Sequence, residues 1–150
     1  MGLFDTFFNV EVMARTLPML WQGLINTVFL ASASIIIGIV VGVSGCLLRL
    51  YGPLPVRLVV VFLIDLFRAI PILVLLVVVY YALPFVGIRL SSFVAAVFVL
   101  SGVLAAFTAE VFRAGIESLP KGQFEAADAL GLPFPVILWK IVLPQAVRVA

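Results

Sequence analysis

The sequence contains no histidine, a single cysteine and few charged residues. One cysteine, Cys46, excludes an internal disulfide and a cysteine-based zinc site. Without histidine, and with Cys46 inside an apolar run, we find no nucleophile and base pair and no metal-binding cluster. Neither Lys121 nor Lys140 lies in a G-x-x-x-x-G-K-[ST] loop, so this loop is not available to bind ATP. We therefore predict that the chain is not an enzyme and has no cofactor and no metal.

Apolar residues dominate the amino-acid composition. Hydrophobic residues make up 65% of the chain, charged residues 11%, and the mean hydropathy is +1.37, values typical of an integral membrane protein. The net charge of +2 is too small to indicate nucleic acid binding. Charge-poor runs of about 20 residues or more are long enough to cross a bilayer. They predict one all-α transmembrane domain over residues 1–150, with spans at about 20–48, 58–83 and 88–114.

The basic residues are unevenly distributed about these spans. Lysine and arginine gather on the cytoplasmic side of membrane proteins, so the N-terminus is predicted outside and the loop after the third span inside. Leu3, Phe4, Phe7 and Phe8 recur at helical spacing, which predicts a short helix in the outer interface. The predicted cytoplasmic residues are Arg49, Arg57, Arg113, Lys121, Lys140 and Arg148, and those of the other side are Arg15 and Arg89.

The loop at about residues 118–144 has the pattern of a short capped helix. Good helix formers end at Gly131, which suits a left-handed C-terminal cap, and the prolines at 133 and 135 prevent continuation. A second segment is predicted at 136–142, before Pro144 begins another element. Glu125 could meet an arginine of a partner, and the small Ala126, Ala127 and Ala129 would let that partner approach closely. We interpret the loop as a docking surface; the alternative is an ordinary cytoplasmic connector.

Charged residues inside the second span have two interpretations. Asp65 and Arg68 lie three residues apart on one face, and Pro71 should kink the helix beside them. Charges near the bilayer centre must face protein or water, so the pair either lines a translocation pathway or is a structural ion pair. Near the end of the third span, Glu110 either supports a helix that emerges into the cytoplasm, together with Arg113 and Glu117, or lines the inner mouth of a pathway.

Small residues at 34, 38 and 42 form one face of the first span. Ser34, Gly38 and Gly42 recur at intervals of four, which permits close packing of helices in lipid. We expect this face to pack inside the same bundle. Homodimerisation through it is the alternative.

The loop also resembles a known pattern. The pattern is E-A-A, three residues, G, nine residues and I-x-L-P. It is typical of permease subunits of ATP-binding-cassette (ABC) importers, and the chain is similar to the permeases of the polar amino acid uptake family. Further matches are Gly23 and Thr27 and residues within 67–74, 81–84, 110–116 and 119–127, although Arg68-Ala69-Ile70-Pro71 departs from the usual Arg-Gly-Thr-Pro. The residues of the loop pattern are Glu125, Ala126, Ala127, Gly131, Ile141, Leu143 and Pro144.

The resemblance implies a type I importer permease fold in a bacterial inner membrane. Such permeases have five spans, so we expect this chain to lack about the last two. The implied partners are cytosolic ABC ATPase subunits, an extracytoplasmic amino acid binding protein, a second permease subunit, alike or different, and membrane lipid. The site residues implied for docking are the loop residues above. The candidate pathway residues, Asp65, Arg68, Pro71 and Glu110, come from the charges and the proline described above and not from the resemblance. The alternatives are a small oligomeric channel or membrane anchor subunit and, third, a membrane-embedded enzyme.

Overall fold

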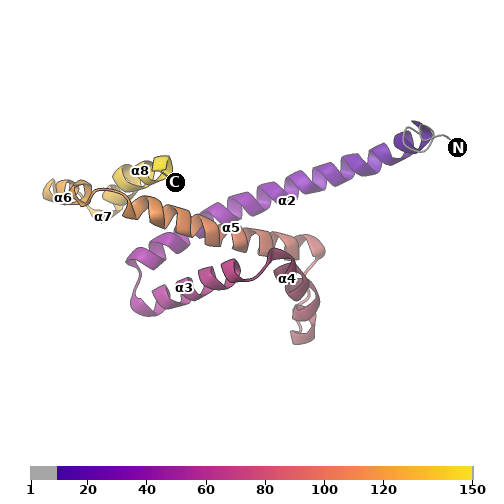
Figure 1. Cartoon of the computed structure of the whole chain (residues 1–150), viewed down its shortest axis with the longest axis horizontal. Coiled ribbons are helices and arrows are strands. Elements are labelled where there is room, and N and C mark those ends of the chain that lie inside the picture. Colours follow the sequence, from indigo (N-terminus) through magenta and orange to yellow (C-terminus); the bar gives the residue numbers. More distant parts are fainter. Residues whose placement is uncertain (1–9, 150) are drawn as a thin grey trace.

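The computed structural model describes residues 10–149, which are helical apart from short connections. α2 (Val10–Tyr51) is one helix of 42 residues, about 63 Å long, that crosses the whole molecule (Figure 1). It begins well before the predicted start near residue 20, and an ion pair between Glu11 and Arg15 (2.6 Å) supports this end. It ends before Gly52 and Pro53, because proline cannot donate the next hydrogen bond. The interfacial helix predicted at 3–8 lies outside the described residues.

The second predicted span is two helices. α3 (Leu54–Ala69) meets the helical run Ile72–Val86, which starts with α4 (Ile72–Val77), at 107°, whereas the sequence predicts only a kinked span at about 58–83. Pro71 causes the break, because it has no N–H and because it holds the preceding Ile70 in an extended conformation (φ −97°, ψ 129°). After α4, the chain continues through a π-helix, η1 (Val78–Ala82), and a 3₁₀ turn, η2 (Leu83–Val86).

α5 (Ser92–Glu117) is the second long helix. It starts four residues after the predicted start, since Gly87 has a left-handed conformation (φ 86°) and Ser91 caps the helix by accepting a hydrogen bond from the N–H of Val94 (3.3 Å). By length and composition, α2 and α5 can each cross a membrane. The α3–α4 pair is a third crossing if its two parts together form one broken span.

α2 and α5 pack closely along the small residues predicted for this purpose. Ser34, Gly38 and Gly42 are buried. A Cβ atom at Gly42 would lie 2.6 Å from the side chain of Thr108, and one at Gly38 would lie 2.8 Å from Leu104. The expectation that this face packs inside the same bundle is confirmed, because α5 occupies it.

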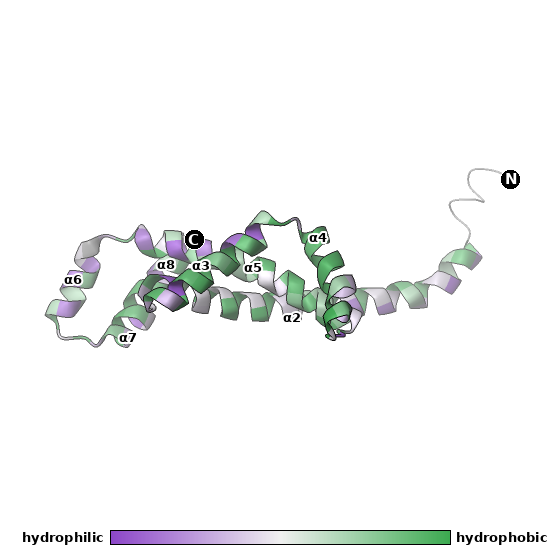
Figure 2. Cartoon of the chain, turned by 90° about the horizontal axis from the view of Figure 1, so that it is seen from below, coloured by the Kyte–Doolittle hydropathy of each residue, from purple (hydrophilic) through white to green (hydrophobic). Residues whose placement is uncertain are grey.

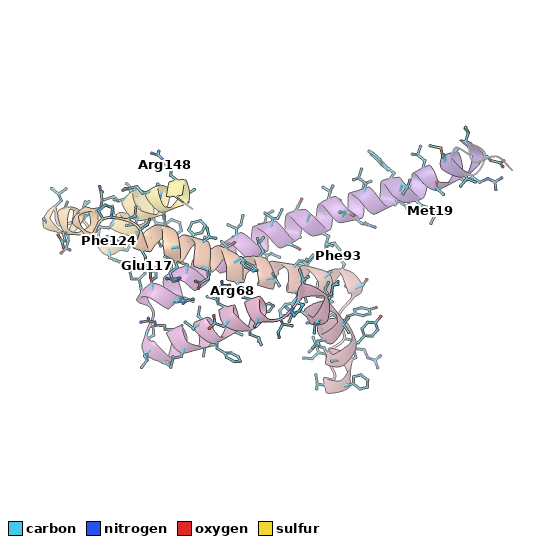
Figure 3. The ribbon with its side chains drawn as sticks, in the orientation of Figure 1. Met19, Arg68, Phe93, Glu117, Phe124 and Arg148 are labelled. Carbon is cyan, nitrogen blue, oxygen red and sulfur yellow. The ribbon has the colours of Figure 1, made fainter. Side chains whose placement is uncertain are left out.

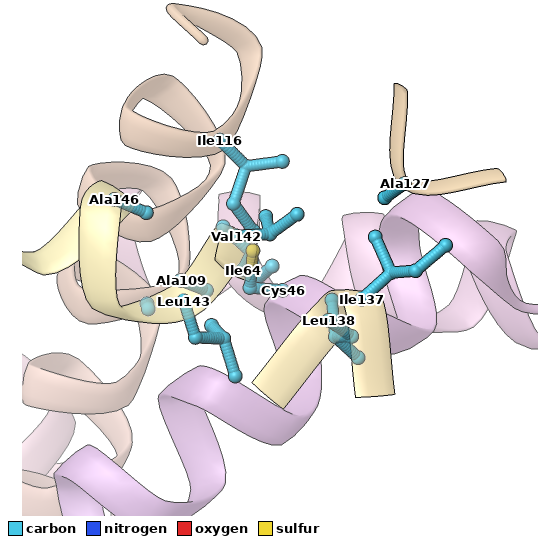
Figure 4. Close-up of a cluster of buried hydrophobic side chains, with 11 residues drawn as sticks. Cys46, Ile64, Ala109, Ile116, Ala127, Ile137, Leu138, Val142, Leu143 and Ala146 are labelled. Atoms are coloured by element: carbon cyan, nitrogen blue, oxygen red, sulfur yellow. The ribbon is translucent and has the colours of Figure 1, made fainter. Parts of the chain in front are cut away.

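The main apolar core lies where α2 and α3 meet the C-terminal half of α5. Four further helical pieces close this end (Figure 1): α6 (Lys121–Ala129), α7 (Phe134–Val136), the π-helix η3 (Ile137–Val142) and α8 (Leu143–Val149). Figure 2 shows hydrophilic residues on α6 and a hydrophobic α4. The core side chains come from α2, α3, α5, α6, η3 and α8 (Figure 4): Cys46, Ile64, Ala106, Ala109, Ile116, Ala127, Ile137, Leu138, Val142, Leu143 and Ala146.

Gly42→Ala should destabilise the protein although alanine favours helices, because its methyl group would collide with α5. We expect a loss of about 1–3 kcal/mol, typical of overpacking. Gly23→Ala in the same helix is the matched control, since a Cβ atom there meets nothing within 4 Å. Thermal unfolding of the purified protein in detergent measures the stability of both variants. Equal melting temperatures for the two variants would contradict the packing described.

Candidate functional site

α6 ends in the left-handed cap predicted at Gly131 (φ 69°). The N–H of Gly131 donates to the carbonyl of Asp128 (2.8 Å), and the N–H of Leu132 donates to the carbonyl of Ala127 (3.2 Å). These two bonds are the Schellman arrangement, which satisfies the last carbonyls of a helix. The cap prediction is therefore confirmed, and the direction in which the chain leaves α6 depends on Gly131.

The chain from Phe134 to Val149 is one helical run with a π-helix in its middle, where the sequence predicts a separate segment at 136–142 and a new element at Pro144. α8 begins at Leu143, with Pro144 in its first turn. A proline cannot bond to the carbonyl four residues before it. The wider turns of η3 before Pro144, like those of η1 before Pro84, accommodate that missing bond without ending the helix.

The residues of the predicted docking pattern divide between two faces. Ala127 and Leu143 are buried in the chain's own core (3% and 6% exposed), and Ile141 packs against that core. Ala127 therefore does not offer the close approach to a partner that the sequence predicts, because its methyl group already meets this chain. Glu125, Ala126, Gly131 and Pro144 are exposed.

The exposed end of α6 includes an apolar residue that the sequence analysis missed. Leu130, the C-cap residue, is 78% exposed, directly beside the Gly131 turn. Glu125 and Asp128 on the same helix are also exposed. An apolar side chain immediately before a capping glycine, inside a polar loop, is the signal that could have identified it. We call Glu125, Ala126, Asp128, Ala129 and Leu130 the α6 tip.

Contacts connect the segment that follows the α6 tip to the ends of the long helices. The ring of Phe134 packs edge-on against Tyr51 at the end of α2, with centroids 4.9 Å apart. A Cβ atom at Gly115 in α5 would lie 2.9 Å from the carbonyl oxygen of Ala146 in α8, so these two backbones nearly touch. α7 is therefore in contact with α2, and α8 with α5.

Glu110 of α5 joins three helices through arginines. Its Oε1 accepts a hydrogen bond from Arg49 of α2, and its Oε2 accepts bonds from Arg113 (2.8 and 3.1 Å). Arg68 of α3 approaches Oε2 to 3.9 Å. Arg113 also pairs with Glu117 (2.5 Å), as expected for a helix with that spacing. The Glu110 side chain is only 15% exposed, so its charge is largely enclosed between α2, α3 and α5.

Asp65 and Arg68 do not form the structural ion pair that was one sequence interpretation. Arg68 turns to Glu110 and stacks over the ring of Phe107 at 5.6 Å. Among residues 10–149, no ion pair or hydrogen bond engages the Asp65 carboxylate. Both side chains are exposed, in the last turns of α3 before the Pro71 break. Figure 3 shows Arg68 at this end of α3. A lipid-facing charge inside the membrane costs about 2.5–3.5 kcal/mol on insertion scales, so this face of α3 must meet protein or water.

An apolar cavity of about 320 Å³ lies between α2, α3 and α5. Its lining includes Val40, Val60, Phe67 and Ala106, without a charged side chain. Among the described residues, no group of three or more Cys, Asp or Glu could hold a metal ion. The cavity therefore offers nothing to a charged ligand, and the charges gather instead at Glu110 and at the end of α3.

Comparison with protein families identifies the kind of protein to which this chain belongs. Residues 34–150 match the model described as binding-protein-dependent transport system inner membrane component. The chain belongs to this family. The family resemblance inferred from the loop pattern is therefore confirmed, and the chain is part of a multi-pass protein of the bacterial inner membrane.

Individual relatives of this inner membrane component are permeases. Over 146 residues it is 34% identical to the probable amino-acid ABC transporter permease protein YckA of Bacillus subtilis, covering 97% of this chain and 65% of YckA. It is 36% identical over 133 residues to the arginine transport system permease protein ArtQ of the same organism, covering 88% of this chain and 61% of ArtQ. Permease subunits are transport proteins and not enzymes. The chain spans less than two thirds of the length of these relatives.

A solved structure shares the fold. The crystal structure of an amino acid ABC transporter with histidines superposes with a TM-score of 0.79 at 32% identity, over 92% of this chain and 64% of that one. The expected all-α importer permease fold is therefore confirmed.

Glu110→Gln should cost about 1.5–3 kcal/mol of stability, the value of hydrogen bonds to a charged group, because Arg49 and Arg113 would lose their shared anion. Glu117→Gln is the control, since its carboxylate is 53% exposed and an exposed ion pair contributes at most about 1 kcal/mol. Chemical or thermal unfolding of the complete permease separates the two variants. A Glu110→Gln protein as stable as Glu117→Gln would contradict the central role of Glu110.

Proposed function

We propose that this chain is part of the permease subunit of an ATP-driven amino acid importer, and that the segment at 118–144 docks a cytosolic ABC ATPase. The observation that carries the docking proposal is the α6 tip, an exposed acidic and apolar surface on a short capped helix whose other face is in the core. The names of YckA and ArtQ support an amino acid as cargo. An ATPase surface with a basic residue and an apolar pocket would complement Glu125 and Leu130.

Docking at the α6 tip would reach the membrane helices by direct contact. Closure of two ATPase subunits on ATP would move α6, and with it α7, η3 and α8, which share its core. The Phe134–Tyr51 contact passes that movement to α2, and the Gly115–Ala146 contact passes it to α5. An extracytoplasmic amino acid binding protein would deliver the cargo from the other side, and a second permease subunit, alike or different, would complete the pathway within the lipid.

We also propose that Asp65, Arg68 and Pro71 face the pathway. Broken helices with charged residues at the break are typical of transporter binding sites, and Pro71 produces a break of this kind. Glu110 has a different role in this proposal, because both its oxygens already bind arginines of this chain. It holds α2, α3 and α5 together at the inner end of the pathway.

The alternative of a small oligomeric channel or anchor has less support. Its assembly surface would be the face at Ser34, Gly38 and Gly42, which α5 already covers. The α6 tip would also have no purpose in a channel without an ATPase.

Gly131→Val should uncouple transport from ATP hydrolysis while the helices still insert, because a β-branched residue is strained at φ 69° and would redirect the α6 tip. We expect substrate-stimulated ATP hydrolysis of the reconstituted complex to fall at least about tenfold, the effect of a strain of about 1.4 kcal/mol or more. Gly122→Val is the matched control, because that glycine is helical and has open space around it. Wild-type stimulation in Gly131→Val would remove the cap from the coupling mechanism.

The proposed orientation places the α6 tip in the cytoplasm and Arg89 outside, in agreement with the distribution of basic residues. Leu130→Cys and Arg89→Cys test it, and Cys46 can stay in place because it is fully buried. On intact cells, a membrane-impermeant thiol reagent should label Arg89→Cys and should label Leu130→Cys only after the membrane is opened. Labelling of Leu130→Cys from outside would reverse the orientation.

A further inference from the structure

Two opposite charges at the end of α3 are close together and yet do not pair. Asp65 and Arg68 are three residues apart on one helix, a spacing that places Cβ atoms about 5–6 Å apart. Both side chains are exposed. In the same structure, Arg113 pairs with Glu110 at this spacing (2.8 Å), so the spacing itself permits an ion pair. Among residues 10–149, the Asp65 carboxylate has no ion pair, and the only ion pair of Arg68 is with the Glu110 carboxylate at 3.9 Å, so both side chains can engage a third group.

Arg68 has hydrogen-bonding capacity to spare. The oxygens of Glu110 accept bonds from Arg49 and Arg113, and Arg68 at 3.9 Å is beyond hydrogen-bond distance. No hydrogen bond from the Arg68 guanidinium occurs within residues 10–149. Since a guanidinium carries five N–H donors in a planar fork, an incoming carboxylate could bind it through two of them.

Packing against α5 anchors the end of α3 that carries these side chains. Phe67, between them in sequence, packs against α5 so closely that a Cβ atom at Gly102 would lie 2.4 Å from its ring. It also packs edge-on against Phe98 with centroids 6.3 Å apart, and Arg68 lies over Phe107. Among residues 10–149, this helix end at a break carries an arginine that makes no hydrogen bond and an aspartate that makes no ion pair, which is a preorganised arrangement for a small ligand of both charges.

We propose that Asp65 and Arg68 form a clamp for the zwitterionic head of an α-amino acid, with the carboxylate on Arg68 and the ammonium group on Asp65. This inference rests on the proposed function, amino acid import. The two charged groups of an α-amino acid are attached to one carbon atom, so a single head can contact two side chains one helical turn apart. Glu110 holds Arg68 in place when the clamp is empty. Because every α-amino acid has this head, the clamp requires a free carboxylate and a free ammonium group and is indifferent to the rest of the molecule.

Analogues with one blocked charge test each half of the clamp separately. The probes are L-arginine and L-glutamine, their α-amides, which lack the carboxylate, and their Nα-acetyl derivatives, which lack the ammonium group. Equilibrium binding is measured on the complete purified permease–ATPase complex without the binding protein, so that only the permease selects. The wild type should bind the free amino acids at least about tenfold more tightly than either derivative, the effect of losing a charge-assisted hydrogen bond.

The two variants should show a crossed pattern. Arg68→Ala should weaken binding of the free amino acids about tenfold or more and abolish the preference over the amides, while the preference over the Nα-acetyl forms remains. Asp65→Ala should do the reverse. Arg57→Ala, an exposed arginine of the same helix, is the matched control and should leave all six affinities unchanged.

Other results would overturn the clamp. Equal weakening of all probes in Arg68→Ala, with a lower melting temperature, would mean that the arginine is structural. Unchanged affinities would mean that another group, such as a lipid phosphate or a second subunit, occupies it. Uptake by cells that produce the same variants distinguishes the two proposals: if the wild type imports amino acids and the crossed pattern is absent, the clamp alone fails. If the wild type neither imports nor binds them, the proposed function fails and the clamp with it.

Discussion

Close packing of α2 against α5 is the contact on which the rest of the structure depends. It needs glycine at 38 and 42, because side chains of α5 occupy the space where a Cβ atom would lie. In lipid there is no hydrophobic force between helices, so this contact is held by van der Waals packing over short distances. Only when the two helices lie this close can Arg49 of α2 reach Glu110 of α5.

The charges around Glu110 then determine where α3 lies against α2 and α5. Arg49 and Arg113 neutralise the carboxylate from two sides, and Arg68 brings the end of α3 to the same place. With Glu117 included, three arginines face two carboxylates, and the excess positive charge is at Arg68. This cluster is partly enclosed, so removing one member would leave others without a counter-charge in a poorly solvated position. The apolar core next to it connects the same helices to α6 and α8.

Features fixed by neighbours in the chain could be predicted from the sequence, and features fixed by distant residues could not. The cap at Gly131 is a local matter of left-handed backbone and two hydrogen bonds, and it was predicted correctly. Pro71 gave the position of the break, but no local pattern gives its angle of 107° or the packing of Phe67 against Gly102. An ion pair of Asp65 with Arg68 was one of two interpretations of their local spacing, and it is not formed, because Arg68 turns to Glu110, which lies far along the chain. Ala127 was assigned to the surface for the same reason: the core that covers it comes from later helices.

In the π-helix η3, the number of residues between the buried positions determines which side chains reach the core. Its inward positions recur at intervals of five, so that Ile137 and Val142 are buried together, as are Leu138 and Leu143. An α-helix has 3.6 residues per turn, and loss of one residue would rotate everything that follows by about 100°. Leu143 and Ala146 would then leave the core. In evolution, substitutions at the exposed Trp139 and Lys140 are therefore open to this segment, whereas insertions and deletions between Val136 and Leu143 are not.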